Sequence, residues 1–243
     1  MRLVLEFTLK DQNMPLEYRK VFMHFIKSCL TNANEGKYYD SFYEEAKSKN
    51  FTFSMFFDNP QYTKEKVILS SKRVKVIFSV LDKMEGYIFY SGFLEKKNTK
   101  VLLEDDNFMI LNKVTKISEP EVHNNKMLIK MNSPLLARKH NRESNRDEYF
   151  YYEQEEFIQE LEYNLRLQLT RQGFQDVLIS GLMVIPVKCR KVVVTHYGCK
   201  FAGSLGNFLI EGDAVILNYL LKSGFGSRHS EGFGMAEFLT DDL

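Results

Sequence analysis

Hydrophobic and polar positions follow two different periods along the chain, and the change of period predicts both strands and helices. Residues 2–9 alternate loosely, which predicts a strand. Met14-Pro15 then opens a pattern in which apolar residues recur at three- and four-residue steps, and this predicts a helix with one apolar stripe. The stripe consists of Tyr18, Phe22, Phe25, Ile26, Cys29 and Leu30. Asn and Gly within residues 32–36 predict the end of this helix.

Later segments of the first half complete a recurring order of elements. β-branched and aromatic residues predict strands over Phe51–Phe57, Val74–Leu81 and Phe108–Ile117. A short helix is predicted over Gly86–Leu94. The first half therefore has the order strand, helix, strand, strand, helix, strand.

The second half repeats this order. Strands are predicted over Lys126–Ala137, Val177–Val187, Lys191–Tyr197, Lys200–Glu211 and Met235–Leu239. A long helix is predicted from an apolar row at four-residue steps, formed by Phe157, Leu161, Leu165 and Leu169. A second helix, capped by Asp213, is predicted from the apolar residues Ile216, Leu217, Leu220 and Leu221. We therefore expect an α+β protein with tandem ferredoxin-like (RRM-like) βαββαβ domains at residues 1–120 and 121–243, with the boundary near Glu119-Pro120.

Composition narrows the class of protein. Hydrophobic residues make up 44% of the chain and charged residues 27%, as in soluble globular proteins. The longest nearly apolar stretch, residues 177–187, is too short to cross a bilayer, and no export signal is visible, so we expect a cytoplasmic protein without a membrane partner. Cys29, Cys189 and Cys199 lack CxxC spacing, so we expect neither a disulfide framework nor a metal site, and no cofactor.

Charge is distributed unevenly, although the net charge is only +1. The segment from residue 188 to residue 228 contains two acids and six basic residues, namely Lys188, Arg190, Lys191, Lys200, Lys222 and Arg228. The segment Glu143–Glu162, in contrast, is rich in acids. This asymmetry indicates one basic face, and the low net charge is compatible with binding a single RNA through a local patch.

A glycine-rich segment lies near the C-terminus: Gly224-Phe-Gly-Ser-Arg-His-Ser-Glu-Gly-Phe-Gly234. Glycines allow positive φ, and successive backbone N–H groups can then surround an anion. Arg228 offers a phosphate fork, and Lys222 and His229 are further donors. Because the segment follows a helix and precedes a strand, it is not a Rossmann loop, and because no Gly-Lys-Ser/Thr ends it, it is not a Walker A loop. We predict a phosphate-binding loop built on Gly224, Gly226, Gly232 and Gly234; the alternative is a flexible connection.

Two histidines have both a functional and a structural interpretation. His196 ends a basic strand, and alternation places it on one face with Arg190, so it either contacts RNA or is satisfied at a strand end. His24 lies on the polar face of the first helix, one turn from Lys27, and is either a substrate-contacting group or a solvated surface histidine.

Several segments occur in a characteristic order along the chain. They are the Met-Arg-Leu start, Asn50-Phe-Thr-Phe-Ser54, Met131-Asn-Ser-Pro-Leu-Leu136, Lys191-Val-Val-Val-Thr-His-Tyr-Gly198, Gly206-Asn-Phe-Leu-Ile-Glu-Gly-Asp213 and the glycine-rich loop. In this order they resemble the CRISPR-associated repeat-cleaving endoribonucleases of the repeat-associated mysterious protein (RAMP) superfamily. The resemblance implies tandem ferredoxin-like folds and metal-independent cleavage of CRISPR precursor RNA by attack of a ribose 2′-OH. Products would carry a 2′,3′-cyclic phosphate and a 5′-OH.

The resemblance also implies where catalytic groups lie. Many members have a histidine shortly after the first helix, a tyrosine within the helix and a lysine before the next strand. Here Lys49 matches the lysine, Tyr43 stands where the histidine is expected, and Lys27 falls near the helical tyrosine. Tyr39 and His24 complete the catalytic candidates. Since the expected histidine is absent, a non-catalytic CRISPR RNA-binding protein or a subunit of a CRISPR effector complex is the alternative, and a homodimer is a further expectation.

Overall fold

The computed structural model describes residues 1–32, 42 and 49–243, so the candidates Tyr39 and Tyr43 lie outside the described residues. The chain divides into two compact units. The N-terminal unit comprises residues 1–49, 54–118 and 195–198, and the C-terminal unit comprises residues 50–53, 119–194 and 199–243.

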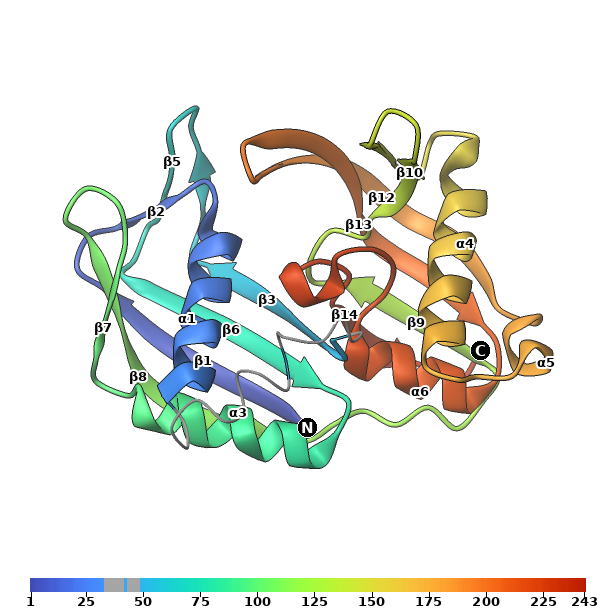
Figure 1. The fold of residues 1–243 in the computed structure, drawn as a ribbon, viewed down its shortest axis with the longest axis horizontal. Helices are drawn as coiled ribbons and strands as arrows, with labels where there is room; N and C mark the ends of the chain where they lie inside the picture. The colour runs from blue at the N-terminus through green and yellow to red at the C-terminus, as the bar shows by residue number, and fades with distance from the viewer. Residues whose placement is uncertain (33–41, 43–48) are drawn as a thin grey trace. The chain divides into compact units, whose positions relative to one another are not determined.

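The N-terminal unit is built on one antiparallel sheet with the strand order β3-β6-β1-β8-β7 (Figure 1). Its strands are β1 (Arg2–Leu9), β3 (Phe51–Phe57), β6 (Arg73–Val80), β7 (Lys100–Leu102) and β8 (Phe108–Ile117). The central strand β1 pairs with both neighbours, Arg2 lying opposite Ser79 in β6 and Ile117 in β8. This is the sheet order of a βαββαβ fold, extended by the edge strand β7.

Helices α1 (Tyr18–Asn32) and α3 (Lys83–Glu95) pack against each other in this unit. The apolar stripe predicted from the sequence is buried at Phe22, Phe25 and Ile26, and both phenylalanines contact Phe7 of β1. Phe25 stacks on Phe93 of α3 with 5.8 Å between the ring centroids. The stripe therefore supplies the core that the hydrophobic pattern predicted.

The start of the first helix was predicted wrongly. Residues Asn13–Pro15 form the short strand β2, which pairs with β5 (Lys66–Ile68), and β4 (Gln61–Tyr62) extends this small sheet. The helix begins only at Tyr18. Met14 is buried in the small sheet, so an apolar residue that fits the helical period is used in a strand.

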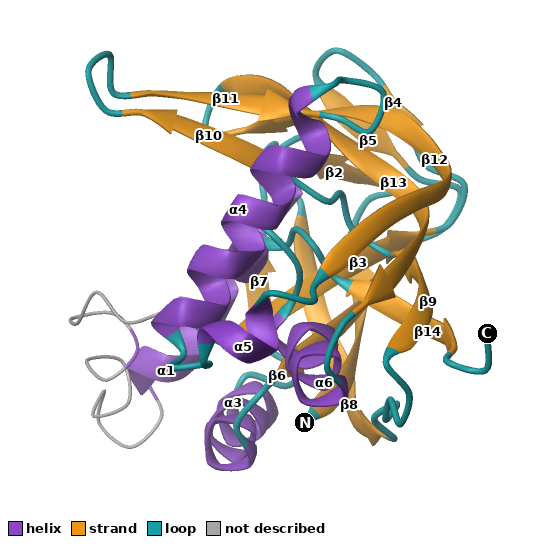
Figure 2. Cartoon of the chain, turned by 90° about the vertical axis from the view of Figure 1, so that its right-hand side faces the viewer, coloured by secondary structure: helices purple, strands orange, loops and turns teal. Residues whose placement is uncertain are grey.

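The C-terminal unit repeats the same sheet order as β12-β13-β9-β14 (Figure 2). Its main strands are β9 (Lys126–Met131), β12 (Met183–His196), β13 (Cys199–Glu211) and β14 (Ala236–Thr240). Its helices are α4 (Glu156–Arg171), α5 (Asp176–Ile179) and α6 (Ala214–Ser223). The predicted row Phe157, Leu161, Leu165 and Leu169 is fully buried. Two βαββαβ units thus confirm the α+β tandem ferredoxin-like fold.

Three strand predictions in this half need correction. The strand predicted over Lys126–Ala137 ends at Met131, and Ala137 instead begins β10 (Ala137–Asn141), which pairs with β11 (Arg146–Phe150). Residues 176–179 form a helix and not the start of a strand. The segments predicted as separate strands, 183–187 and 191–196, are one continuous strand, β12.

None of the helices in the described ranges is both long and apolar enough to cross a bilayer.

Candidate functional site

The glycine-rich loop, Gly224–Gly234, connects α6 to β14 in the C-terminal unit. The carboxylate of Asp213 accepts a hydrogen bond from the Val215 N–H at 2.8 Å and caps α6, as predicted. The helix ends at Gly224, whose φ is 94° and whose N–H donates to the Leu220 carbonyl at 2.8 Å. The loop thus follows a helix and precedes the last strand.

Two buried phenylalanines anchor the loop. Phe225 is 1% exposed and Phe233 is fully buried. The Phe225 N–H donates to the Gly234 carbonyl at 2.8 Å, which closes the loop at its base. Gly234 has a φ of 64°, and a Cβ there would lie 1.9 Å from the Phe225 carbonyl oxygen. Only glycine fits this close approach. The fold alone therefore explains a glycine at position 234, whether or not a ligand binds.

Three successive backbone amides at the tip of the loop make no backbone hydrogen bond within the described part of the chain. Arg228 adopts a left-handed conformation with a φ of 57°, and residues His229–Glu231 form the short 3-10 helix η2. Among the described residues, the N–H groups of Arg228, His229 and Ser230 donate to no backbone oxygen. Successive amides next to a left-handed residue form a concavity that suits an anion.

The side chain of Arg228 is bound on three sides within the unit. Its Nε donates to the Tyr149 hydroxyl at 2.7 Å, its Nη1 to Glu231 at 2.9 Å, and its Nη2 to Asp147 at 3.2 Å. The guanidinium that the sequence predicted as a phosphate fork is therefore paired with two carboxylates. In this arrangement it fixes the loop to the β10–β11 hairpin.

Asp147 of β11 is the centre of this network. Its Oδ2 accepts from Arg138 at 3.2 Å and from the Tyr149 hydroxyl at 3.3 Å, in addition to Arg228. Its Oδ1 accepts from Nδ1 of His140 at 2.8 Å. One carboxylate thus joins three basic side chains, which are otherwise distributed over the hairpin and the loop.

The ionisation of these groups follows from their surroundings. Burial acts to raise the pKa of Asp147, but the hydrogen bond from His140 and the charges of Arg138 and Arg228 outweigh it, so the pKa is lowered. Burial acts to lower the pKa of Arg228, but the carboxylate of Glu231 and the hydrogen bond to Tyr149 raise it above the usual value. Burial raises the pKa of Tyr149, which keeps the hydroxyl neutral. The network therefore consists of fixed charges linked by a neutral hydroxyl.

Helix α4 holds the same region through an amide side chain. Oδ1 of Asn164 accepts from the Arg138 N–H at 2.7 Å and from the Ser227 hydroxyl at 2.8 Å. Its Nδ2 donates to the Arg138 carbonyl at 2.7 Å. Asn164 therefore ties hairpin and loop to the helix by neutral hydrogen bonds.

The other candidates of the loop region are also engaged. Nδ1 of His229 donates to the Phe51 carbonyl at 3.2 Å. Burial lowers the pKa of His229, although this contact acts in the opposite direction, so the neutral imidazole is favoured. Lys222, in the last turn of α6, pairs with Glu119 at 3.8 Å. Of the remaining glycines, Gly224, Gly226 and Gly232 all have positive φ.

The basic residues of β12 are exposed. Lys188 and Arg190 are open to solvent, and the ammonium group of Lys191 lies 4.0 Å from the centroid of the Tyr151 ring. His196, at the end of the strand, is 2% exposed, and its ring centroid is 4.5 Å from that of Tyr197. The exposed part of the strand therefore carries the three cations but not the histidine.

The catalytic candidates belong to the N-terminal unit. His24 is exposed and Lys27 half-buried, both on α1, and Lys49 is half-buried shortly before β3. Tyr39 and Tyr43 lie outside the described residues.

Asp147, Tyr149, Glu231 and Asn164 were missed by the sequence reasoning. Asp147 lies within a segment that its acidic composition placed apart from the basic face. A turn-like run, Asn141-Arg-Glu-Ser-Asn-Arg146, between two short polar segments was the available signal for the hairpin.

The fold and the loop together define a class of protein: a chain of two ferredoxin-like units, with a glycine-rich loop before its last strand. A family model for the C-terminal part of CRISPR associated protein Cas6 matches residues 117–238, half of the chain. The chain belongs to the Cas6 family.

Solved structures match the whole chain at low identity. The product of a Cas6-related gene from Pyrococcus furiosus superposes with a TM-score of 0.84 at 16% identity, covering 100% of this chain and 99% of that one. A RAMP protein described as binding different RNA substrates gives 0.83 at 16% identity, with 99% and 100% covered. A CRISPR associated protein Cas6 gives 0.76 at 19% identity, with 99% of each chain covered. These likenesses establish the fold. No curated protein matches the chain by sequence.

Proposed function

We propose that this protein binds CRISPR repeat RNA and cleaves precursor CRISPR RNA within its repeats. Membership of the Cas6 family supports the substrate class. The observation that carries the proposal is the loop tip, where the N–H groups of Arg228, His229 and Ser230 have no backbone acceptor among the described residues. Such a group of amides suits one backbone phosphate, and the exposed cations of β12 suit others along a strand.

The roles within the glycine-rich loop differ from residue to residue. Phe225 and Phe233 hold the loop in place, and the four glycines allow its path. The amides at the tip contact the phosphate, and the remaining N–H donors of Arg228 add to this contact. Neutral His229 supports the backbone of Phe51, and Lys222 contributes long-range positive charge from the end of α6.

The chemistry we propose is transesterification without a metal ion. A base removes the proton of the ribose 2′-OH, and its oxygen attacks the adjacent phosphorus. The bond from phosphorus to the 5′-oxygen breaks, and that oxygen takes up a proton. The products carry a 2′,3′-cyclic phosphate and a 5′-OH. The protein has to align the bond, move two protons and stabilise the charge of the phosphorane.

We assign these roles to α1 and the segment that follows it. Lys27 and Lys49 would stabilise negative charge, and Tyr39 and Tyr43 would position the phosphate. Tyrosine, with an ordinary pKa of ~10, is a poor base at neutral pH, whereas histidine, at ~6.5, is suited to this role. His24, which is exposed on α1, is therefore our candidate for the base.

Cleavage of a cognate repeat RNA in EDTA tests the proposal. We expect specific cutting in EDTA and none with a substrate that has a single 2′-deoxy substitution at the scissile nucleotide. Substitution His24→Asn should slow the cutting of bound RNA, whereas His123→Asn, at another exposed histidine, should have no effect. Tight binding without product from either substrate would refute the nuclease and leave an RNA-binding protein.

The absence of a histidine at position 43 favours a second candidate, a non-catalytic CRISPR RNA-binding protein or effector-complex subunit. A stoichiometric complex along a guide RNA, isolated from cytoplasm, would support this candidate. Sedimentation with and without RNA would establish whether the chain is a homodimer.

A further inference from the structure

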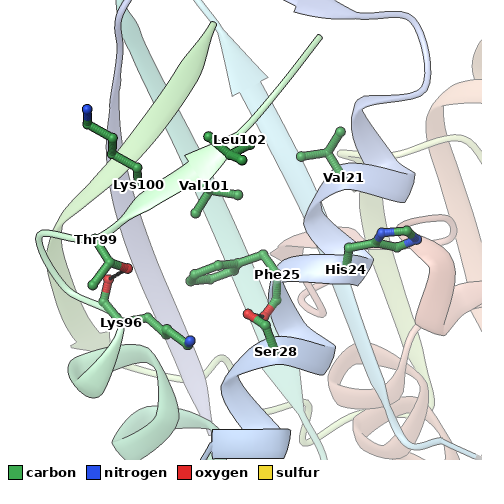
Figure 3. A pocket seen from close by; sticks show the side chains of 9 residues that line it. All are labelled: Val21, His24, Phe25, Ser28, Lys96, Thr99, Lys100, Val101 and Leu102. Carbon is green, nitrogen blue, oxygen red and sulfur yellow. Dashed lines mark hydrogen bonds between the residues drawn. The ribbon is translucent and has the colours of Figure 1, made fainter. Parts of the chain in front are cut away.

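A groove lies between α1 and the edge strand β7 in the N-terminal unit (Figure 3). Its volume is about 390 Å³, within the range of pockets that hold small ligands. It is lined by Val21, His24, Phe25, Ser28, Lys96, Thr99, Lys100, Val101 and Leu102. We call it the α1–β7 groove.

The apolar lining residues and the polar or basic ones occupy different parts of the groove. Val21 and Phe25 from α1 lie across from Val101 and Leu102 of β7, so the middle of the groove is apolar. The Lys96 ammonium reaches toward Ser28 at one end, and the ends of His24 and Lys100 point away from the centre, at opposite rims (Figure 3). A ligand with a flat apolar part and a negative group fits this arrangement.

The lining of the groove carries positive charge that no acidic lining residue balances. None of its lining residues is acidic. In the described part of the chain, neither Lys96 nor Lys100 has a carboxylate within ion-pair distance, and the Lys100 ammonium lies 4.5 Å from the Phe108 ring centroid. Lys96 therefore presents to the groove a charge that forms no ion pair with any described residue.

The hydroxyl groups of the lining add a further preference. Ser28 donates its proton to the Phe25 carbonyl at 2.8 Å, and Thr99 donates to the Lys96 carbonyl at 2.7 Å. Their oxygens are then left as acceptors. An acceptor next to a cation suits a group that combines phosphate with hydroxyl donors, as a ribonucleotide does.

We propose that the α1–β7 groove binds one nucleotide of the repeat RNA, with the base on Val21 and Leu102 and the phosphate at Lys96. This inference rests on the proposed function. The contact of the base with Val21 would then lie on α1, the helix that also carries the candidate base His24. His24 and Lys100 lie at opposite rims of the groove. Bases stack on apolar and aromatic side chains with little regard to sequence, so the groove would hold the strand without reading a particular base.

Binding of a repeat RNA with a 2′-deoxy scissile nucleotide, which prevents cutting, tests the groove. Lys96→Ala should weaken binding roughly fivefold, as expected for one charged contact, and reduce the slope of log K against log salt by about 0.7. Lys97→Ala is the matched control, because Lys97 is exposed, adjacent and outside the lining. Leu102→Asp should weaken binding further, whereas Met84→Asp, at another exposed apolar residue of this unit, should not. Urea midpoints of the four variants check folding.

The possible results distinguish a failure of the groove proposal from a failure of the proposed function. If all four variants bind RNA like the wild type, the groove proposal is overturned and the proposed function stands. If the wild type does not bind repeat RNA, both fall. If adenosine monophosphate binds the wild type and is lost in Lys96→Ala while RNA affinity is unchanged, the groove holds a free nucleotide, and the assignment to RNA is wrong.

Discussion

The guanidinium of Arg228 lies 3.2 Å from the carboxylate of Asp147, although 81 positions separate them in the chain. This contact joins the glycine-rich loop to the β10–β11 hairpin. It also means that the arginine most readily assigned to RNA holds the protein's own structure together. Structural and RNA-binding roles of Arg228 therefore need different experiments.

Asp147→Asn should destabilise the C-terminal unit. The substitution removes the negative charge that pairs with Arg138, His140 and Arg228, and we expect a loss of about 1–3 kcal/mol in the free energy of unfolding. The neighbouring exposed carboxylate offers a control, since Glu148→Gln removes the same charge and should change stability little. Urea unfolding at neutral pH measures both; equal values for the two variants would contradict the role of Asp147.

Arg228→Ala should weaken RNA binding and reduce its dependence on salt, because a cation near a phosphate is lost. Asp147→Asn is the informative comparison. If Arg228 acts only by holding the loop, both variants should lower affinity and leave the salt slope as in the wild type. If Arg228 also contacts RNA, only Arg228→Ala should lower the slope, by about 0.7 for a single strand. Filter binding over a range of salt concentrations measures the slope.

His229 should make stability depend on pH. Burial lowers the pKa of His229 in the folded state, so between the unfolded value of ~6.5 and the lower folded value the unfolded chain binds more protons. Its contribution is present above the unfolded pKa and is lost as the pH falls through the folded pKa. His229→Gln should remove this part of the pH dependence, whereas His123→Gln, at an exposed position, should retain it. Unfolding curves between pH 4 and pH 8, about the working range of histidine, test this; parallel curves for the wild type and His229→Gln would contradict it.

Gly234→Ala should be strongly destabilising. The left-handed conformation alone costs an alanine about 1 kcal/mol, and the added Cβ would clash with the Phe225 carbonyl oxygen. We expect a total loss above about 2 kcal/mol and weaker RNA binding. Gly181→Ala is the control, since a Cβ there meets nothing within 4 Å. Thermal unfolding of the two variants decides the matter: a Gly234→Ala protein as stable as Gly181→Ala would show that the loop can rearrange.

Much of the fold was predictable because many of its helices and strands are specified by residues close together in the sequence. Strand Phe108–Ile117 and the Asp213 cap were predicted as the structure has them, since β-branched residues and a capping carboxylate act over a few positions. The errors arose where two local signals compete. Val177 and Ile179 favour a strand, but Asp176 stands in the first turn of a helix that includes both.

The network around the loop could not be predicted in the same way. Strands β10 and β11 are mostly polar, so they lack the alternation that identifies a strand with one buried face. Asp147, the partner of Arg228, lies in a segment that the sequence analysis could describe only as rich in acids. A contact between residues so far apart depends on the tertiary fold, and no local pattern encodes it.

The two buried phenylalanines of the glycine-rich loop also bear on how tightly RNA can bind. Ordering a free loop costs about 1–2 kcal/mol of conformational entropy for each residue. Because Phe225 and Phe233 are already anchored, that cost falls on folding and not on association. The amides at the tip are preorganised, so the affinity for a phosphate would depend chiefly on the contacts themselves.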